Sequence, residues 1–197
     1  MNERREFFVS TASCVGALGR VKQTAAELSL AAKNAKAIAY RAGTAAVGFK
    51  PLTDYIDEMG RTTARLVTEI SREALAVARQ AVDDQRLQEA LVRLQRGRDQ
   101  IATPQDGLDR VIAKVRADVD TARATSARGL RRLLELLDDI SHTMRAAGVI
   151  STRARVEATQ AGIHEDSLRM VADKVERAAG EIRTIIGRCE RQLREAA

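Results

Sequence analysis

Several residue types that mark common fold classes are scarce in this chain of 197 residues. It has no tryptophan, two prolines and 3% aromatic residues, against 45% hydrophobic and 30% charged residues. Few β-branched or aromatic residues alternate with a period of two, so the sequence predicts no β-strand. A composition rich in alanine, leucine and valine instead indicates an all-α or coiled-coil protein.

Long apolar segments and a disulfide framework are missing as well. No run approaches the roughly 18 apolar residues of a membrane span, and the charged start MNERREFF does not read as a secretory signal. Two cysteines are too few to form a disulfide framework. We therefore expect a cytoplasmic protein. The net charge of +6 is modest beside 33 basic and 27 acidic residues, and does not by itself indicate nucleic-acid binding.

Apolar residues recur at steps of three and four along most of the chain, which predicts four helices. We expect them over residues 5–42, about 50–101, 108–161 and from Ser167 onward. Small residues at 44–48 predict a tight turn, and Pro51 fits the first turn of the next helix. The clearest break is 103–107, where Thr103 and Asp106 have the spacing of a capping box. A second turn is expected at 162–166, with Asp166 or Ser167 capping the last helix.

Two segments, 34–56 and 153–175, repeat one another at an offset of 119 positions. Gly43 falls on Gly162, and six residues later Phe49 falls on Leu168. The repeat predicts two tandem helical hairpins, 1–102 with a turn near 43–49 and 103–197 with a turn near 162–167. Together they predict an elongated antiparallel four-helix bundle.

The two middle helices should be the longest, at about 75–80 Å each for a rise of 1.5 Å per residue. With antiparallel threading, they extend beyond the four-helix section as a two-stranded stalk. An apolar seam left uncovered on this stalk is our reason to expect a homo-oligomer.

The repeated segments resemble the cytoplasmic signalling hairpin of bacterial methyl-accepting chemotaxis proteins. The first copy shares with that family Asn34, Ala35, Ala39, Arg41, Ala42, Gly43, Gly48 and Phe49. The second matches or comes close at Ala154, Val156, Glu157, Ala158, Ala161, Gly162, Val171, Ala172, Asp173 and Val175. The copies depart from the pattern at Ile38, Arg153 and Gln160, and in the loop 163–167.

In the family that this chain resembles, two identical hairpins dimerise, and the tip of the bundle contacts a histidine kinase and its coupling protein. The resemblance implies a soluble, non-catalytic signalling protein that binds those partners, or receptor tips. The implied partner-binding residues at the hairpin tips are Asn34, Ile38, Arg41, Phe49, Arg153, Glu157, Gln160 and Leu168. Asn34 and Arg41 from one hairpin, with Glu157 from the other, are expected to form one composite face. The paired Glu/Gln pattern of methylation sites is absent, so we expect no adaptation by methylation.

A second hypothesis is a structural helical protein that coats an anionic surface, such as a granule, a membrane or nucleic acid. The clusters Arg93–Arg98 and Arg128–Arg132 would serve it, but interspersed acidic residues favour a solvated charged face. We find no phosphate-binding loop and no nucleophile motif, and therefore expect neither an enzyme nor a cofactor.

Four other residues, two cysteines and two histidines, could have either a functional role or a purely structural one. Cys14 and Cys189 lie at similar distances from Gly43 and Gly162, which places them at one height on neighbouring helices. They form either a redox pair or two small core residues, and a reducing compartment favours the core. His142 is expected to contact Asp138 one turn earlier. His164 adjoins two acidic residues in a loop, where three neighbours cannot converge on one metal ion, so no metal site is expected.

Overall fold

The computed structural model describes residues 2–101 and 106–195, and side chains from residue 9 onward. Within these ranges the chain forms four α-helices and two short 3-10 helices and has no strand. In order they are α1 (Asn2–Arg41), η1 (Gly43–Ala46), α2 (Phe49–Asp99), α3 (Asp106–Ala158), η2 (Gly162–His164) and α4 (Glu165–Glu195). The expected helices agree to within a few residues. The predicted cap at Thr103 lies outside the described residues.

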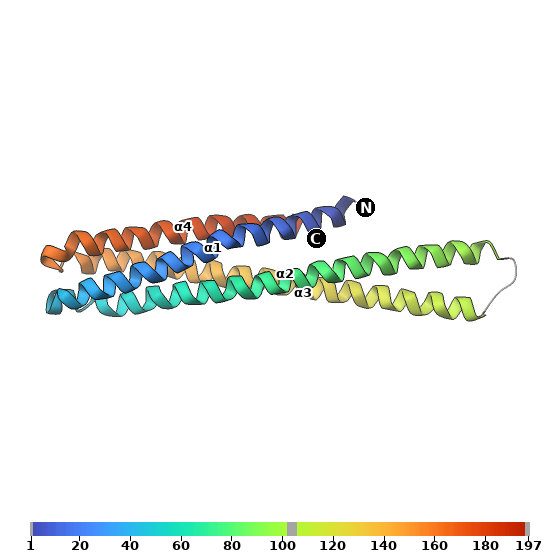
Figure 1. The fold of residues 1–197 in the computed structure, drawn as a ribbon, viewed down its shortest axis with the longest axis horizontal. Coiled ribbons are helices and arrows are strands. Elements are labelled where there is room, and N and C mark those ends of the chain that lie inside the picture. Colours follow the sequence, from blue (N-terminus) through green and yellow to red (C-terminus); the bar gives the residue numbers. More distant parts are fainter. Residues whose placement is uncertain (1, 102–105, 196–197) are drawn as a thin grey trace.

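The four helices close into a bundle in which each packs against two neighbours. α1 packs on α2 and α4, and α3 packs on the same two helices. Successive helices run in opposite directions, so η1 and η2 lie at one end, which we call the tip (Figure 1). The start of α1 and the end of α4 lie close together part-way along the rod. The prediction of an all-α four-helix bundle made of two hairpins is thus confirmed.

Two glycines make the tip turns. Gly43 has φ 64° and Gly162 has φ 57°, and no other described residue has a positive φ. A side chain in this left-handed region crowds the backbone, whereas glycine adopts it freely and commonly ends a helix there. Pro51 lies in the first turn of α2, as predicted. Asp166 and Ser167 lie inside the first turn of α4 and so do not cap it from outside, because α4 begins earlier, at Glu165.

The core changes in character along the bundle. Its long middle part contains leucine, isoleucine and valine from all four helices. At the tip, a second cluster contains mainly alanines, which allow close helix approach, around three large side chains. The buried members of this tip core are Ala35, Ala39, Ala46, Phe49, Leu52, Ala154, Ala158, Ala161, Leu168 and Ala172.

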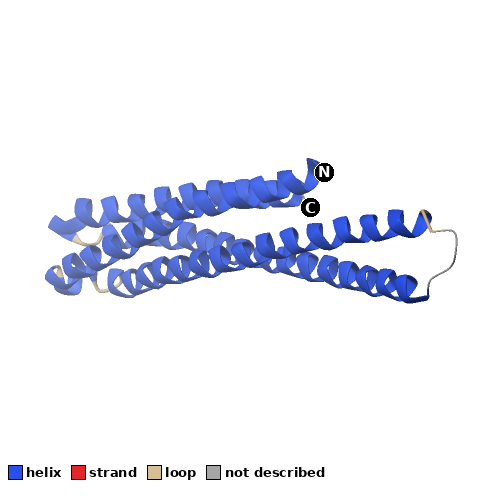
Figure 2. Ribbon diagram, turned by 45° about the vertical axis from the view of Figure 1, so that its right-hand side comes forward, coloured by secondary structure: helices blue, strands red, loops and turns tan. Residues whose placement is uncertain are grey.

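Beyond the ends of α1 and α4, α2 and α3 continue as the predicted two-stranded stalk (Figure 2). Only two of its apolar side chains are fully buried, those of Ile112 and Val119, at 7% and 3% exposure. Leu87, Leu91 and other apolar residues along the seam are half-buried between the two helices. Near the far end, Arg98 Nε lies 2.7 Å from Asp109 Oδ1 and links the helices.

The faces that α1 and α4 cover in the bundle become polar in the stalk. Gly60 marks the line of α2 that faces α1, because a Cβ there would lie 2.8 Å from the carbonyl oxygen of Ala25. Continuing that line in steps of seven leads through Val67, Ala74 and Ala81 to Gln88 and Gln95. The line of α3 through Met144 and Leu137 leads likewise to Arg123, Arg116 and Asp109. The uncovered seam is therefore less apolar than expected. The homo-oligomer stays a prediction, because a polar seam gives little reason for a second chain to cover it.

Candidate functional site at the bundle tip

The two hairpins have the same burial pattern at positions related by the sequence repeat. Ala39 and Ala158 are fully buried, and so are Phe49 and Leu168, each with 0% exposure. All four residues belong to the tip core. The repeat seen in the sequence therefore corresponds to a repeated packing arrangement.

An ion pair is repeated as well. Lys36 Nζ lies 2.5 Å from Asp54 Oδ1 in the first hairpin. At the equivalent positions of the second, Arg155 Nε lies 2.8 Å from Asp173 Oδ1. The hydrogen bond to Asp54 raises the pKa of Lys36, so the ammonium stays charged. Each pair joins the two helices of its own hairpin next to the tip.

The contact between hairpins differs on the two sides of the tip. On one side the carboxylate of Glu157 lies over Gly48, just before α2, where a Cβ would overlap it. The positions equivalent to Glu157 and Gly48 are Ile38 and Ser167. Ile38 is half-buried and packs against the tip core. One side of the tip therefore carries a carboxylate where the other carries an aliphatic side chain.

The structure separates the predicted binding residues by burial. Asn34, Arg41, Arg153 and Gln160 are exposed, whereas Ile38 and Glu157 are half-buried. Phe49 and Leu168 are entirely buried. The expectation that those last two contact a partner is wrong for the folded bundle, because they fill the tip core and support the turns from inside.

The predicted composite face of Asn34, Arg41 and Glu157 does not form on one side of the tip. Lys36 faces α2 through Asp54. At about 100° per residue, Asn34 and Arg41 then point away from α2. Glu157, by contrast, lies on the α2 side, against Gly48.

The exposed and half-buried residues instead form two separate sets, related by the repeat. We call Asn34, Ile38 and Arg41 the first tip face. The second tip face consists of Arg153, Glu157 and Gln160. Each face combines residues that are one turn apart on a single helix, α1 for the first and α3 for the second.

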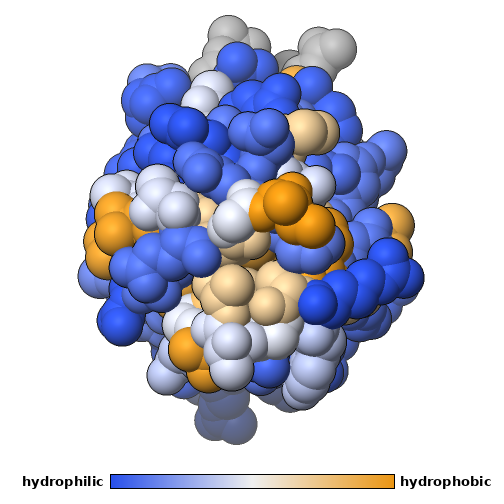
Figure 3. Space-filling view, turned by 90° about the vertical axis from the view of Figure 1, so that its left-hand side faces the viewer, coloured by the Kyte–Doolittle hydropathy of each residue, from blue (hydrophilic) through white to orange (hydrophobic). Residues whose placement is uncertain are grey.

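Several apolar side chains in and near the two tip turns are exposed. Ile163 in η2 is 95% exposed and Val47, just after η1, is 64% exposed. The end-on view in Figure 3 shows strongly hydrophobic residues at several places around a centre of intermediate hydropathy. Sequence reasoning missed this property, although an isoleucine in a turn expected to be small and polar was a usable signal. The other exposed apolar residues near the tip are Tyr40, Val156 and Met170.

Away from the tip, the two cysteines meet between α1 and α4, as their spacing predicted. Cys14 and Cys189 are 3% and 1% exposed, and both are free thiols. Cys189 Sγ lies 3.9 Å from the backbone oxygen of Cys14. A hydrogen bond between the thiols and burial raise the pKa of Cys14. Both thiols are nearly inaccessible to solvent, and inaccessible thiols react slowly, which favours the core role over the redox role.

The remaining candidates are surface features. His142 Nε2 lies 3.5 Å from Asp138 Oδ2, which confirms the predicted contact one turn apart. Among the described residues, no group of three or more His, Cys, Asp or Glu side chains is arranged to hold a metal ion. Searched over the same residues, none of the helices is sufficiently long and apolar to span a membrane.

Comparison with protein-family models, curated proteins and solved structures finds no match. The likeness to chemoreceptor hairpins therefore depends on the residues of the two repeated segments.

Proposed function

We propose that this chain is a non-catalytic, chemoreceptor-like signalling protein that binds partner proteins through the tip of its bundle. The observation that carries the proposal is the pair of tip faces, which the repeat places at equivalent positions on α1 and α3. The proposed partners are the chemotaxis histidine kinase, its coupling protein or the tips of chemoreceptors.

The tip has the surface chemistry that protein partners use. It combines exposed charged and amide groups, such as Arg41, Arg153 and Gln160, with exposed apolar groups, such as Ile163 and Val47. Apolar contacts surrounded by polar groups are typical of protein interfaces. Ile163, at 95% exposure, does not stabilise the isolated chain by burial. Burying it against a partner would remove its apolar surface from water, which is favourable.

The two faces offer different chemistry to a partner. The first combines the aliphatic Ile38 with Asn34 and Arg41, and the second combines the carboxylate of Glu157 with Arg153 and Gln160. A dimer of identical chains presents the same face twice. A single chain with two unlike faces suits two different partners, or one partner bound in a single orientation.

The test is a titration of the purified protein against the coupling protein and the kinase of the same organism, at moderate salt. We expect saturable binding in which Arg41→Ala weakens contact with one partner and Glu157→Gln weakens contact with another. Loss of a typical interface contact should raise Kd by about tenfold, or about 1.4 kcal/mol. Neither change should lower the melting temperature, because Arg41 is exposed and Gln keeps the shape of Glu157.

Matched controls lie far from the tip on α4, where Arg177→Ala and Glu181→Gln change exposed residues of the same types. They should leave Kd unchanged. Equal weakening by the tip variants and these controls would show that overall charge, not the tip, drives binding. Absence of binding to all of these partners at tens of micromolar would refute the proposal.

A further inference from the structure

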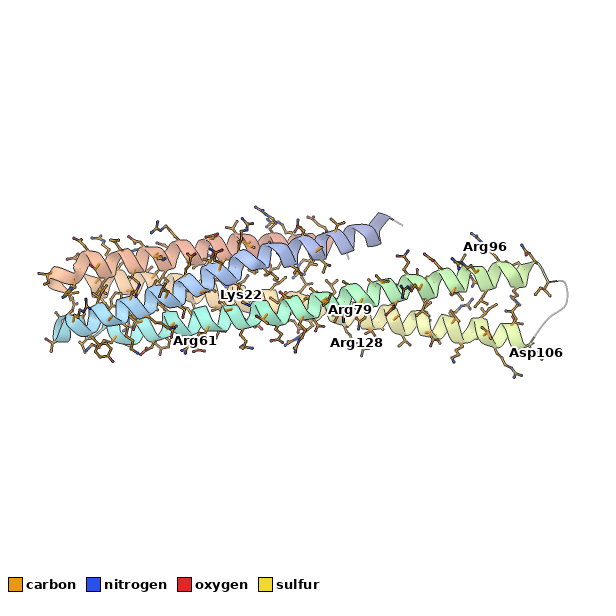
Figure 4. The ribbon with its side chains drawn as sticks, in the orientation of Figure 1. Lys22, Arg61, Arg79, Arg96, Asp106 and Arg128 are labelled. Carbon is orange, nitrogen blue, oxygen red and sulfur yellow. The ribbon has the colours of Figure 1, made fainter. Side chains whose placement is uncertain are left out.

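The outer surface of α2 carries five arginines at strict seven-residue intervals. We call Arg65, Arg72, Arg79, Arg86 and Arg93 the arginine ridge, and all five are exposed. In a left-handed helical bundle a seven-residue repeat stays on one face. The ridge therefore follows α2 for about 42 Å, at 1.5 Å per residue. Figure 4 shows Arg79 near the middle of α2, where the bundle gives way to the stalk.

Five acidic residues of α2 lie between the arginines of the ridge, but only three of these arginines have a close acidic partner. Arg65, Arg86 and Arg93 each have an acidic neighbour one turn away, at 3.6, 3.7 and 3.8 Å. Such exposed pairs are weak and exchange readily with other anions. Among the described residues, no carboxylate lies within 4.0 Å of the guanidinium of Arg72 or Arg79. The middle of the ridge is thus available to an external anion.

Two exposed apolar residues alternate with these central arginines. Leu75 is 53% exposed and Val82 is 42% exposed. They lie three residues after Arg72 and Arg79 respectively, and therefore next to them on the helix surface. Basic side chains are attracted to anionic lipid headgroups, and aliphatic side chains beside them can enter the headgroup region.

Nucleic acid suits this surface less well. Single strands are held by stacking on aromatic side chains, and α2 has no aromatic residue beyond Tyr55. Duplex phosphates attract the arginines but gain nothing from Leu75 and Val82. The alternation of arginine with aliphatic residues therefore favours a lipid surface.

We propose that the arginine ridge of α2 binds an anionic lipid surface, with the rod lying along it and Leu75 and Val82 facing the headgroups. This interaction uses a part of the molecule far from the two tip faces. It is independent of the proposed tip function, and both can operate in one molecule.

The experiment measures co-sedimentation of the full chain with vesicles of phosphatidylcholine containing about one third phosphatidylserine. We expect binding that weakens with salt. A variant with Arg72, Arg79 and Arg86 all changed to Gln should bind at least about tenfold more weakly, because each basic group near an anionic surface contributes several-fold. The control variant changes Arg177, Arg183 and Arg191 of α4 to Gln. It removes the same charge from exposed positions and should retain most of the affinity.

The double variant Leu75→Ser/Val82→Ser separates the lipid surface from a general polyanion. It should weaken vesicle binding and leave any binding to a duplex DNA probe unchanged. Helicity by circular dichroism checks that each variant is folded. Equal losses in the two arginine variants, or binding to duplex DNA without binding to vesicles, would overturn the proposal.

Discussion

The hairpin of α1 and α2 and the hairpin of α3 and α4 agree where they are packed and differ where they meet. Buried positions match closely, from Ala39 and Ala158 to Phe49 and Leu168. The contacts between hairpins do not match, because Glu157 lies over Gly48 whereas Ile38 occupies the equivalent place on the other side. Packing restricts a core position in both copies alike, but a position at the rim can change in one copy alone.

This difference has a functional consequence that two identical chains cannot achieve. In a symmetric dimer any change at the rim appears on both sides. In a single chain the two tip faces can differ, so that the second has the carboxylate of Glu157 where the first has the aliphatic Ile38. The two hairpins can be compared first in the core, then in the turns and finally in the ion pairs.

The largest effect should come from the tip core. Phe49→Ala should lower the free energy of unfolding by about 3–5 kcal/mol and Leu168→Ala by about 2–5 kcal/mol, because each leaves a cavity among closely packed alanines. Urea unfolding monitored by circular dichroism measures both. The exposed Leu75→Ala is the control and should change stability by less than about 0.5 kcal/mol. A loss in only one of the two core variants would mean that the hairpins are not equivalent in the core.

The sequence was sufficient to predict the helices, the tip turns and the stalk, because each depends on local signals. Apolar spacing marks a helix, and a glycine followed six residues later by an apolar residue marks each turn. The role of Phe49 and Leu168 was predicted wrongly for a related reason. The repeat shows that two positions are equivalent, but it does not show which way their side chains point.

Features that depend on the relative placement of helices escaped prediction. The approach of Glu157 to Gly48 joins residues more than 100 positions apart, and its geometry depends on how the hairpins fit together. The polar character of the stalk seam appears only once Gly60 shows which line of α2 faces α1. The arginine ridge is hidden among 33 basic residues until the bundle shows which positions of α2 face outward.

A smaller effect is expected at the two turns. Gly43→Ala and Gly162→Ala each place a Cβ on a residue with positive φ, at a cost of roughly 1–2 kcal/mol. For a domain of this size each kcal/mol lowers the melting temperature by about 2–4 °C. Neither new Cβ would meet another atom within 4 Å, so the two losses should be similar.

Gly97 provides the control for the turns, because it lies inside α2 without positive φ and also has open space at its Cβ. Gly97→Ala should therefore stabilise the protein, by up to about 1 kcal/mol. If all three variants changed stability in the same direction, backbone conformation at the turns would not be the cause.

The smallest difference should separate the repeated ion pairs. Arg155 also pairs with Glu176, and its side chain is 31% exposed. Arg155→Gln should therefore cost about 0.5–1 kcal/mol, near the upper end for a partly exposed pair. Lys36 is 41% exposed, so Lys36→Gln should leave the melting temperature unchanged within error.

The comparison of ion pairs is made at neutral pH, because the raised pKa of Lys36 keeps its charge until the pH passes above the usual lysine range. The contribution of Lys36, which is too small to shift the melting temperature measurably, is present below the unfolded-state pKa and is lost as the pH rises through the higher folded-state pKa. Added salt should reduce the loss caused by Arg155→Gln, because exposed charges are screened. If Lys36→Arg stabilised the first hairpin, the difference between hairpins would come from the side chain, since a guanidinium can bind two carboxylates at once. If it did not, the difference would come from the position of the acidic partners, and the hairpins would differ in helix placement as well as in sequence.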